Sequence, residues 1–173
     1  AGTAIEESDR LLAMIDAMLF ISRTEAGVTR PDCKPIDLAA LVRDACELFR
    51  ALAEDKRIRL ACSAPEQLTL AADAPLVQRM LANLIDNAIK YTPEGGEVTV
   101  TLEPDANGAA VIRVRDTGPG IADADLPRLF ERFYRGDPSR SQPGAGLGLS
   151  LARAVARAHG GDLTVATSPA GST

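Results

Sequence analysis

A strand–turn–strand pattern in the middle of the chain limits the folds that this sequence can adopt. Residues 97–103 read EVTVTLE and residues 110–116 read AVIRVRD, with an Asn-Gly pair at 107 and 108 between them. Alternation with a period of two is typical of a strand with one buried face, and Asn-Gly favours a tight hairpin turn. The pattern therefore predicts an antiparallel pair whose apolar face must be covered by another layer.

Helical patterns supply that layer. LAALVRDACELFRALAEDK follows Asp37, a second helical stretch follows Asp73 with Pro75 in its first turn, and LGLSLARAVARAHG stops at Gly160. The runs IRLACS, QLTLAA and GDLTVATS are strand-like. Without βαβ alternation, we expect an α+β fold: a two-layer α/β sandwich of one mixed, mainly antiparallel sheet against a helical layer, preceded by an N-terminal helix. On the first of these helices, one face is expected to hold Leu38, Leu41, Val42, Ala45 and Leu48.

The first segment is helical in pattern up to about Glu25. Ile5, Leu12 and Leu19 recur every seven residues within a wide apolar stripe, which needs either another helix or a second copy of the chain as partner. Gly27 is expected to end the helix, and VTRPDCKP reads as a linker.

Composition excludes several functional classes. A chain of 173 residues suits one domain plus an appendage, and its net charge of -5 argues against binding of a nucleic-acid backbone. Two tyrosines and no tryptophan argue against an aromatic stacking platform for single-stranded nucleic acid. No run approaches about 18 apolar residues, and no signal peptide is recognised. Cys33, Cys46 and Cys62 show no metal-binding spacing and are interpreted as reduced packing thiols.

The helix containing NLIDNAIKYTP carries an unusual polar stripe. Asn83, Asn87 and Lys90 lie on one side of it, opposite Leu81 and Ile85. Asparagine costs roughly 0.5 kcal/mol of helix stability against alanine, whereas solvated faces usually carry better helix formers. A ligand-binding stripe is therefore favoured over an ordinary solvated face.

Glycine-rich stretches follow. DTGPG at 116–120 leaves a strand, so its carboxylate could accept from an amino group, although a plain turn would explain it equally well. PGAGLGLSLA at 143–152 enters a helix, whose free amides suit phosphates, but a flexible hinge is the alternative. It matches neither a Walker loop nor a dinucleotide fingerprint.

The long irregular stretch between the two glycine motifs is typical of a lid over a ligand. Within LFERFYRG at 129–136, Phe130 and Phe133 could fasten one end of that lid, and Arg132 and Arg135 could reach phosphate. A surface turn with core phenylalanines is the alternative interpretation.

In this order, the four stretches resemble the N, G1, F and G2 boxes of the catalytic ATP-binding domain of bacterial sensor histidine kinases. That domain has the Bergerat fold of the ATPase superfamily that includes gyrase B, the MutL proteins and heat-shock chaperones. The resemblance runs from about residue 5 to the last residue. It implies a remnant of the second helix of the dimerisation and histidine-phosphotransfer hairpin at 1–26, a linker at 27–36, and a catalytic domain at 37–173 with its lid at about 117–146.

The resemblance also implies roles for individual residues. Asn87 would hold Mg²⁺ with Asn83 near the ion and the γ-phosphate, and Lys90 would contact phosphate, which makes these three the expected catalytic residues. Tyr91 would border ATP, and Asp116 would accept from the adenine amino group and so reject GTP. The other expected nucleotide-binding residues are Gly118, Gly120, Ile121, Phe130, Arg132, Arg135, Gly144, Gly146, Leu147, Gly148 and Leu149.

Asn83 bears on the reaction type. In the superfamily's hydrolases the first position of the stripe is a glutamate that acts as general base on water, and an amide cannot do this. The expected reaction is therefore transfer of the γ-phosphoryl group to a histidine, which depends on positioning and electrostatics. A non-catalytic module that senses ATP or docks a partner remains the alternative, and ATP hydrolysis is a weaker one.

The acceptor histidine is expected outside this chain. The sequence holds one histidine, His159, at the end of a helix, where a structural role is favoured. We therefore expect a fragment that does not phosphorylate itself, from a homodimeric kinase anchored in the inner membrane with this domain in the cytoplasm. Its expected partners are ATP, the phosphoacceptor helix and a cognate response regulator, with no nucleic acid.

Overall fold

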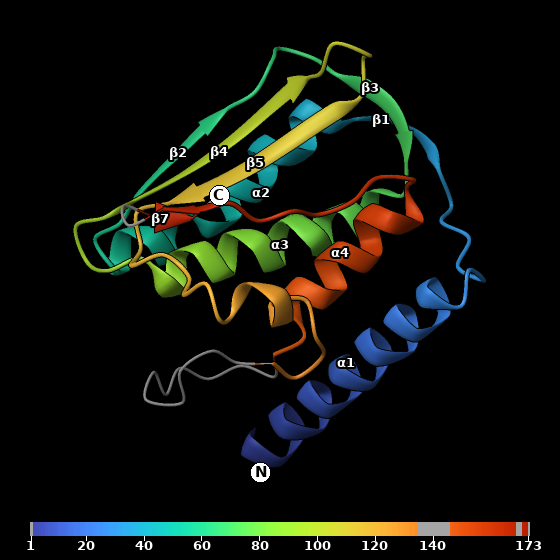
Figure 1. Ribbon diagram of the computed structural model, residues 1–173, viewed down its shortest axis with the longest axis horizontal. Coiled ribbons are helices and arrows are strands. Elements are labelled where there is room, and N and C mark those ends of the chain that lie inside the picture. The colour runs from blue at the N-terminus through green and yellow to red at the C-terminus, as the bar shows by residue number, and fades with distance from the viewer. Residues whose placement is uncertain (1, 135–145, 169–170, 173) are drawn as a thin grey trace.

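The computed structural model describes residues 2–134, 146–168 and 171–172, and its elements form two layers (Figure 1). A twisted sheet lies over a helical layer, and an N-terminal helix projects beyond that layer (Figure 1). The order of elements agrees with the sandwich predicted from the sequence.

The main sheet has five strands in the order β2-β4-β5-β7-β6. Their bounds are β2 Arg59–Ser63, β4 Glu97–Pro104, β5 Ala110–Asp116, β6 Thr167–Ser168 and β7 Gly171–Ser172. β2 runs parallel to β4, and the other neighbours are antiparallel, so the sheet is mixed and mainly antiparallel as predicted. The expected hairpin forms between β4 and β5, with Gly108 in its turn at φ +81°. The Asp105 carboxylate closes that turn by accepting from the Asn107 and Ala109 amides, both at 2.8 Å.

The helical layer consists of α2 Leu38–Asp55, α3 Ala74–Tyr91 and α4 Gly148–Ala158. The predicted caps are present: Asp37 accepts from the Ala39 amide at 3.0 Å, and Asp73 accepts from the Leu76 amide at 3.2 Å. These bonds satisfy amides in the first turns that have no partner within the helix.

The core lies between the sheet and the helices. β4 contributes Val98, Val100 and Leu102, and α3 contributes Leu81 and Ile85, all at most 2% exposed. Alternate residues of β4 face this core, which is the pattern that its sequence predicts.

The expected core face of α2 is partly wrong. Leu48 is 76% exposed, whereas Val42 and Cys46 are buried and Phe49 packs against the core. Because a helix turns about 100° per residue, Phe49 follows Val42 on the same face and Leu48 falls outside it. Burial raises the pKa of the Cys46 thiol to about 12, consistent with an inert packing thiol. Cys33 and Cys62 are exposed, so the expectation of packing thiols is wrong for these two residues.

Two strand expectations need correction. The predicted linker ends in β1 Lys34–Asp37, which pairs antiparallel with β3 Thr69–Ala72 as a separate two-stranded sheet. Conversely, within the expected strand GDLTVATS only Thr167 and Ser168 are strand. Both outcomes depend on pairing partners, because an extended segment becomes a strand only where a neighbour aligns its backbone groups.

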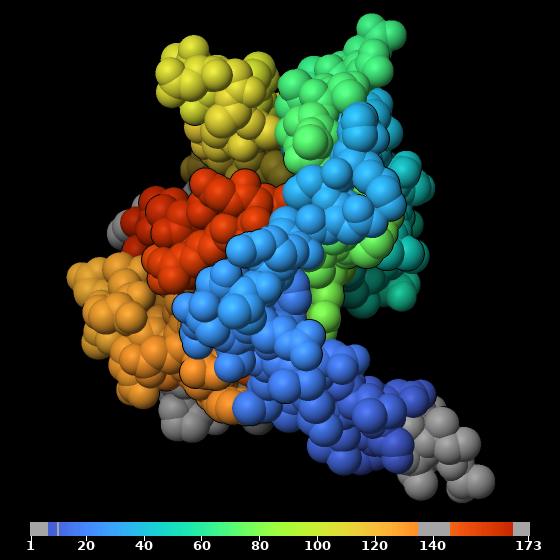
Figure 2. Space-filling model, turned by 90° about the vertical axis from the view of Figure 1, so that its right-hand side faces the viewer, coloured from blue at the N-terminus to red at the C-terminus, as the bar shows by residue number. Residues whose placement is uncertain are grey.

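Helix α1 Gly2–Glu25 lies outside the sandwich and packs on α4 (Figure 1). Ala17 and Ile21 are buried there in a cluster with Leu147, Leu151 and Ala154. The space-filling view shows α1 and the linker running along this side of the molecule (Figure 2). Another face of α1 is exposed and carries Leu11, Leu12, Ile15 and Leu19. None of the described helices is long and apolar enough to cross a membrane.

Candidate functional site

The polar stripe of α3 meets the start of α4. The Asn83 side-chain amide donates to the Arg79 carbonyl at 2.7 Å, which leaves its Oδ1 turned toward Gly148. A Cβ atom on Gly148 would lie 3.1 Å from that oxygen. The fold therefore brings the first glycine of α4 against the stripe, as the expected site requires. Asn83, Asn87 and Lys90 are all half-buried.

A lysine that the sequence analysis missed supports the end of this stripe. The Lys56 ammonium donates to the carbonyls of Ile89 and Lys90, each at 2.7 Å, and burial lowers the pKa of Lys56. These carbonyls belong to the last turn of α3, where a cation is favourable. Lys90 Nζ lies 5.5 Å from the centre of the Tyr91 ring. Because Lys56 reaches α3 from another element, no local pattern could identify it.

Asp116 lies at the end of β5 and is 8% exposed. Its Oδ1 accepts from the Gly118 amide at 2.8 Å. A Cβ atom on Gly118 would lie 2.8 Å from this oxygen and 2.9 Å from the Tyr91 carbonyl oxygen. The strand end and the end of α3 thus meet at a point where only glycine fits.

The chain after Gly118 is anchored to the last strands. Gly120 adopts φ +74°, a conformation that suits glycine, and the half-buried Ile121 follows it. The Ile121 amide donates to the Thr167 hydroxyl at 2.9 Å. This bond directs the start of the expected lid past the edge of the sheet.

Residues 129–134, here called the Phe130 segment, return to the start of α4. The Phe133 amide donates to the Gly146 carbonyl at 3.0 Å, and φ is positive at both residues. A Cβ atom on Gly146 would lie 2.8 Å from the Phe133 carbonyl carbon, so glycine is required there. The F-box and G2-box stretches are therefore in direct contact.

Other expected nucleotide residues have different surroundings. Arg132 forms an ion pair with Glu25 of α1 at 3.4 Å, and Leu147 is buried in the cluster with α1. The Phe130 ring lies beneath the Arg153 guanidinium, and Leu149 is half-buried in the first turn of α4. Arg135 and Gly144 lie outside the described residues.

Metal binding by the asparagines fits the donor chemistry. The described residues hold no cluster of three or more His, Cys, Asp or Glu side chains suited to a metal ion. Mg²⁺ is commonly held by one or two protein oxygens together with water and substrate phosphates. Asn83 directs an amide oxygen toward the start of α4, and Asn87 follows one turn later on the same stripe. These residues are therefore compatible with a metal–phosphate ligand.

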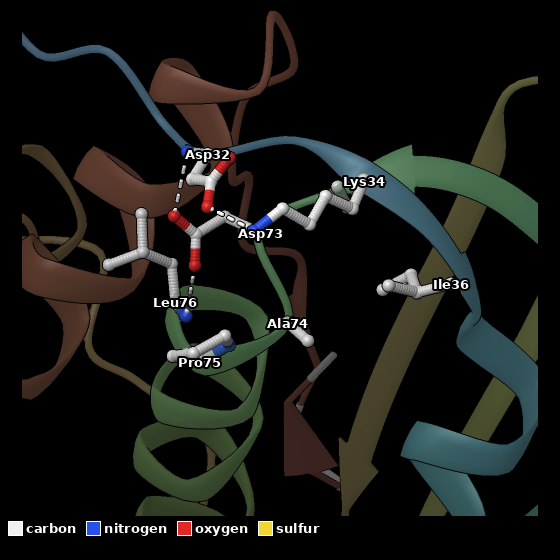
Figure 3. Close-up of a pocket in the computed structure, with 8 residues that line it drawn as sticks. Asp32, Lys34, Ile36, Asp73, Ala74, Pro75 and Leu76 are labelled. Carbon is white, nitrogen blue, oxygen red and sulfur yellow. Dashed lines mark hydrogen bonds and ion pairs between the residues drawn. The ribbon is translucent and has the colours of Figure 1, made fainter.

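A pocket of about 470 Å³ lies elsewhere, between the linker, β1 and the start of α3 (Figure 3). Asp73 organises it: its Oδ2 accepts from the Asp32 amide at 2.9 Å, while its Oδ1 caps α3 (Figure 3). Leu76 in this pocket and Asn87 on the stripe are separated by roughly 16 Å along the helix axis. The pocket is therefore separate from the predicted site.

His159 has a structural role. Its Nε2 accepts from the Asp73 amide at 3.0 Å, and its Nδ1 lies 2.8 Å from the Val155 carbonyl oxygen. Through these two contacts the ring ties the end of α4 to the start of α3. This agrees with the expectation that His159 is structural.

The profile of one protein family, described as histidine kinase-, DNA gyrase B-, and HSP90-like ATPase, matches residues 72–173. The chain belongs to this family. The match covers the α3 stripe, Asp116 and the glycine-rich start of α4, so the resemblance inferred from those motifs is confirmed.

Curated relatives are bacterial sensor proteins. The chain is 40% identical over 172 residues to sensor protein SphS of Synechococcus elongatus, covering 94% of the chain and 41% of SphS. It is 36% identical to sensor histidine kinase CusS of Escherichia coli strain K12, covering 96% of the chain and 35% of CusS. The chain thus spans about two-fifths or less of the length of these two relatives.

Solved structures of histidine kinases share the fold. Full-length ShkA, crystallised in complex with AMPPNP, has a TM-score of 0.82 and 33% identity, covering 98% of this chain and 36% of ShkA. The mycobacterial sensor histidine kinase MprB has a TM-score of 0.70 and 32% identity, covering 81% of this chain and 92% of that chain. The chain is therefore a histidine-kinase ATPase domain preceded by a helix.

Proposed function

We propose that this domain binds Mg²⁺·ATP and transfers the γ-phosphoryl group to a histidine on a phosphoacceptor helix outside this chain. The observation that carries the proposal is the close approach of Gly148 to Asn83, since a Cβ atom on Gly148 would lie 3.1 Å from Asn83 Oδ1; this approach joins the glycine-rich helix start to the polar stripe of α3. Exposed amides at a helix start attract phosphate, and amide oxygens suit Mg²⁺, so together they fit a metal–triphosphate unit.

Each residue would act through binding or orientation. Asn87 and Asn83 would hold Mg²⁺, which neutralises phosphate charge when bound. Lys90 would contact a phosphate beside Tyr91. Asp116, held by the Gly118 amide, would accept from the adenine amino group. Gly118, Gly120 and Ile121 would shape the base side, and Gly144, Gly146, Gly148 and Leu149 the phosphate side.

The structure refines the proposal at the remaining positions. Arg132 is paired with Glu25, so its contact with phosphate would require exchange of partners. Leu147 is packed against α1 and would act by fixing the helix start. Phe130 would fasten one end of the lid, and Arg135 would reach phosphate. Asn83 cannot serve as a general base, which favours transfer to histidine over hydrolysis.

The parent protein would be a homodimeric sensor kinase anchored in the inner membrane, with this domain in the cytoplasm. Residues 1–26 would belong to the dimerisation hairpin, 27–36 to the linker and 37–173 to the catalytic domain. A cognate response regulator would accept the phosphoryl group. The family membership and the sensor kinases among the relatives support this assignment.

Calorimetric titration tests the binding step. ATP and GTP are titrated with and without Mg²⁺ into the wild type, Asp116→Asn and, as control, the exposed Asp105→Asn in the β4–β5 turn. We expect the wild type and the control to bind ATP in preference to GTP. The ATP affinity of Asp116→Asn should be lower by tenfold or more, because a hydrogen bond to a charged group contributes about 1.5–3 kcal/mol. Folded wild type that binds no ATP would contradict the proposal.

The transfer step needs a second assay. The domain is mixed with a separately supplied acceptor hairpin from a related sensor kinase and radiolabelled ATP. Acid-labile label on the hairpin would support a kinase. ATP binding without transfer to any hairpin tested would instead favour the ATP-sensing module.

A further inference from the structure

Arg153 connects the Phe130 segment to the body of the domain. Its guanidinium carbon lies 4.6 Å from the centre of the Phe130 ring, which is within the range of a cation–π interaction. Arg153 is the sixth residue of α4, about one and a half turns after the helix start. The segment thus contacts α4 at a second place, beyond the bond between Phe133 and Gly146.

Asp162 fixes the Arg153 side chain from the other side. Nε of Arg153 donates to Asp162 Oδ1 at 2.9 Å, and Nη2 of Arg153 donates to Asp162 Oδ2 at 3.2 Å. This two-pronged bond holds the pKa of Asp162 well below its usual range, and the Asp162 backbone lies just beyond the Gly160 turn that ends α4. A bidentate pair fixes the plane of the guanidinium, so the face presented to Phe130 is fixed as well.

Arg157 provides an internal comparison. Nε of Arg157 donates to Asp162 Oδ1 at 3.2 Å, but within the described part of the chain its guanidinium lies over no aromatic ring. Both arginines are partly exposed, so their ion pairs alone contribute little to stability. What distinguishes Arg153 is its contact with Phe130.

We propose that Arg153 is a positioning residue for nucleotide binding, which clamps the Phe130 ring and thereby fixes the Phe130 segment against the start of α4. The inference rests on the proposed function. The route runs through neighbouring residues: Phe130 and Phe133 share one short segment, the Phe133 amide donates to the Gly146 carbonyl, and Gly148 lies close to Asn83. Release of Phe130 would loosen the segment that packs on the phosphate side of the site.

The test compares Arg153→Met with Arg157→Met by two measurements. The first is ¹⁹F NMR of protein labelled with fluorophenylalanine. The protein has four phenylalanines, and the Phe130 signal is identified as the one that disappears in the Phe130→Leu variant. The second is the Kd for ATP. In Arg153→Met we expect the chemical shift of the Phe130 signal to change and the Kd to rise about threefold to tenfold, the range expected of a partly exposed cation–π contact. Arg157→Met should leave both near the wild-type values, and Arg153→Lys should recover part of the affinity.

The outcomes separate the two proposals. A wild type that binds ATP, together with an Arg153→Met variant that matches Arg157→Met in both measurements, would overturn the positioning role alone. A folded wild type without ATP binding would overturn the proposed function and this inference with it. If Arg153→Met does not fold, Phe130→Leu removes the other partner, and unchanged ATP affinity in that variant would also overturn the role.

Discussion

Gly118 has no room for a side chain, because an added Cβ atom would lie 2.8 Å from Asp116 Oδ1 and 2.9 Å from the Tyr91 carbonyl oxygen. The same residue donates its amide to Asp116, so one glycine both permits and orients the buried carboxylate. At this scale the candidate site depends on close backbone approach rather than on an unusual side chain.

Replacing Gly118 by alanine should therefore disturb Asp116 directly. The added methyl group must displace either that carboxylate or the end of α3, at a cost typical of overpacking, about 1–3 kcal/mol. We expect ATP affinity to fall about tenfold in Gly118→Ala, measured by calorimetry.

Gly161→Ala is the matched control, since its Cβ would meet only the Ala156 carbonyl oxygen at an ordinary 3.5 Å. Equal ATP affinity in the two alanine variants would show that the Asp116 carboxylate does not need this close approach.

At the scale of elements, Asp73 joins three segments. Its side chain caps α3 and accepts the Asp32 amide of the linker, while its own amide donates to His159 at the end of α4. The helix that carries the polar stripe and the helix with the glycine-rich start are thus tied together at the ends that lie away from the candidate site. One residue thereby influences how α3 and α4 lie relative to each other.

Loss of this joint should be visible in thermal unfolding. Asp73→Ala removes the cap and the linker bond, and the cap alone is worth about 1 kcal/mol. For a chain of this length, each kcal/mol lowers Tm by roughly 2–4 °C. We expect a decrease of this order in Tm by circular dichroism, whereas Asp73→Asn should retain most of the cap.

Asp32→Ala serves as a second control, because the side chain of Asp32 makes an exposed ion pair with Lys34 and such pairs contribute little. A Tm for Asp73→Ala as high as that of Asp32→Ala would contradict the role of the joint.

At the scale of the whole molecule, α1 is attached to the sandwich through a small apolar cluster on α4. Ile21 is 2% exposed within it, and Glu25 pairs with Arg132 of the Phe130 segment. The helix outside the sandwich therefore contacts both the start of α4 and the segment that packs on it. Any displacement of α1 would change the surroundings of Leu147, the residue between two glycines of the candidate site.

Ile21→Ala should loosen α1 without unfolding the sandwich. Removal of a buried isoleucine side chain beyond Cβ typically costs 2–5 kcal/mol, a large share of what so small a cluster can supply. We expect faster hydrogen exchange of amides in α1 and unchanged exchange in α3, measured by mass spectrometry. Leu12→Ala, at a position 60% exposed, should leave both patterns unchanged. Protection of α1 that survives Ile21→Ala would show that other contacts hold the helix.

Features that depend on neighbours along the chain could be predicted from the amino-acid sequence. Periodicity identified the helices and the β4–β5 hairpin, Asp37 and Asp73 were recognisable as caps, and the order of four short motifs identified the family. These signals are readable because caps, turns and amphipathic faces are set by residues within one or two turns of each other. The prediction failed at Leu48 because the spacing of apolar residues shows that a helix has a buried face but does not show where the centre of that face lies.

Contacts between segments that are distant along the chain became known from the three-dimensional fold. It paired β1 with β3 instead of leaving a plain linker, left residues 161–166 outside the strands, and set Lys56 against the last turn of α3. It also turned Arg132 toward Glu25 and placed Arg153 over Phe130. Such contacts depend on how the helical layer packs against the sheet and on which strands pair. Because the partners lie far apart along the chain, no short-range sequence pattern predicts them.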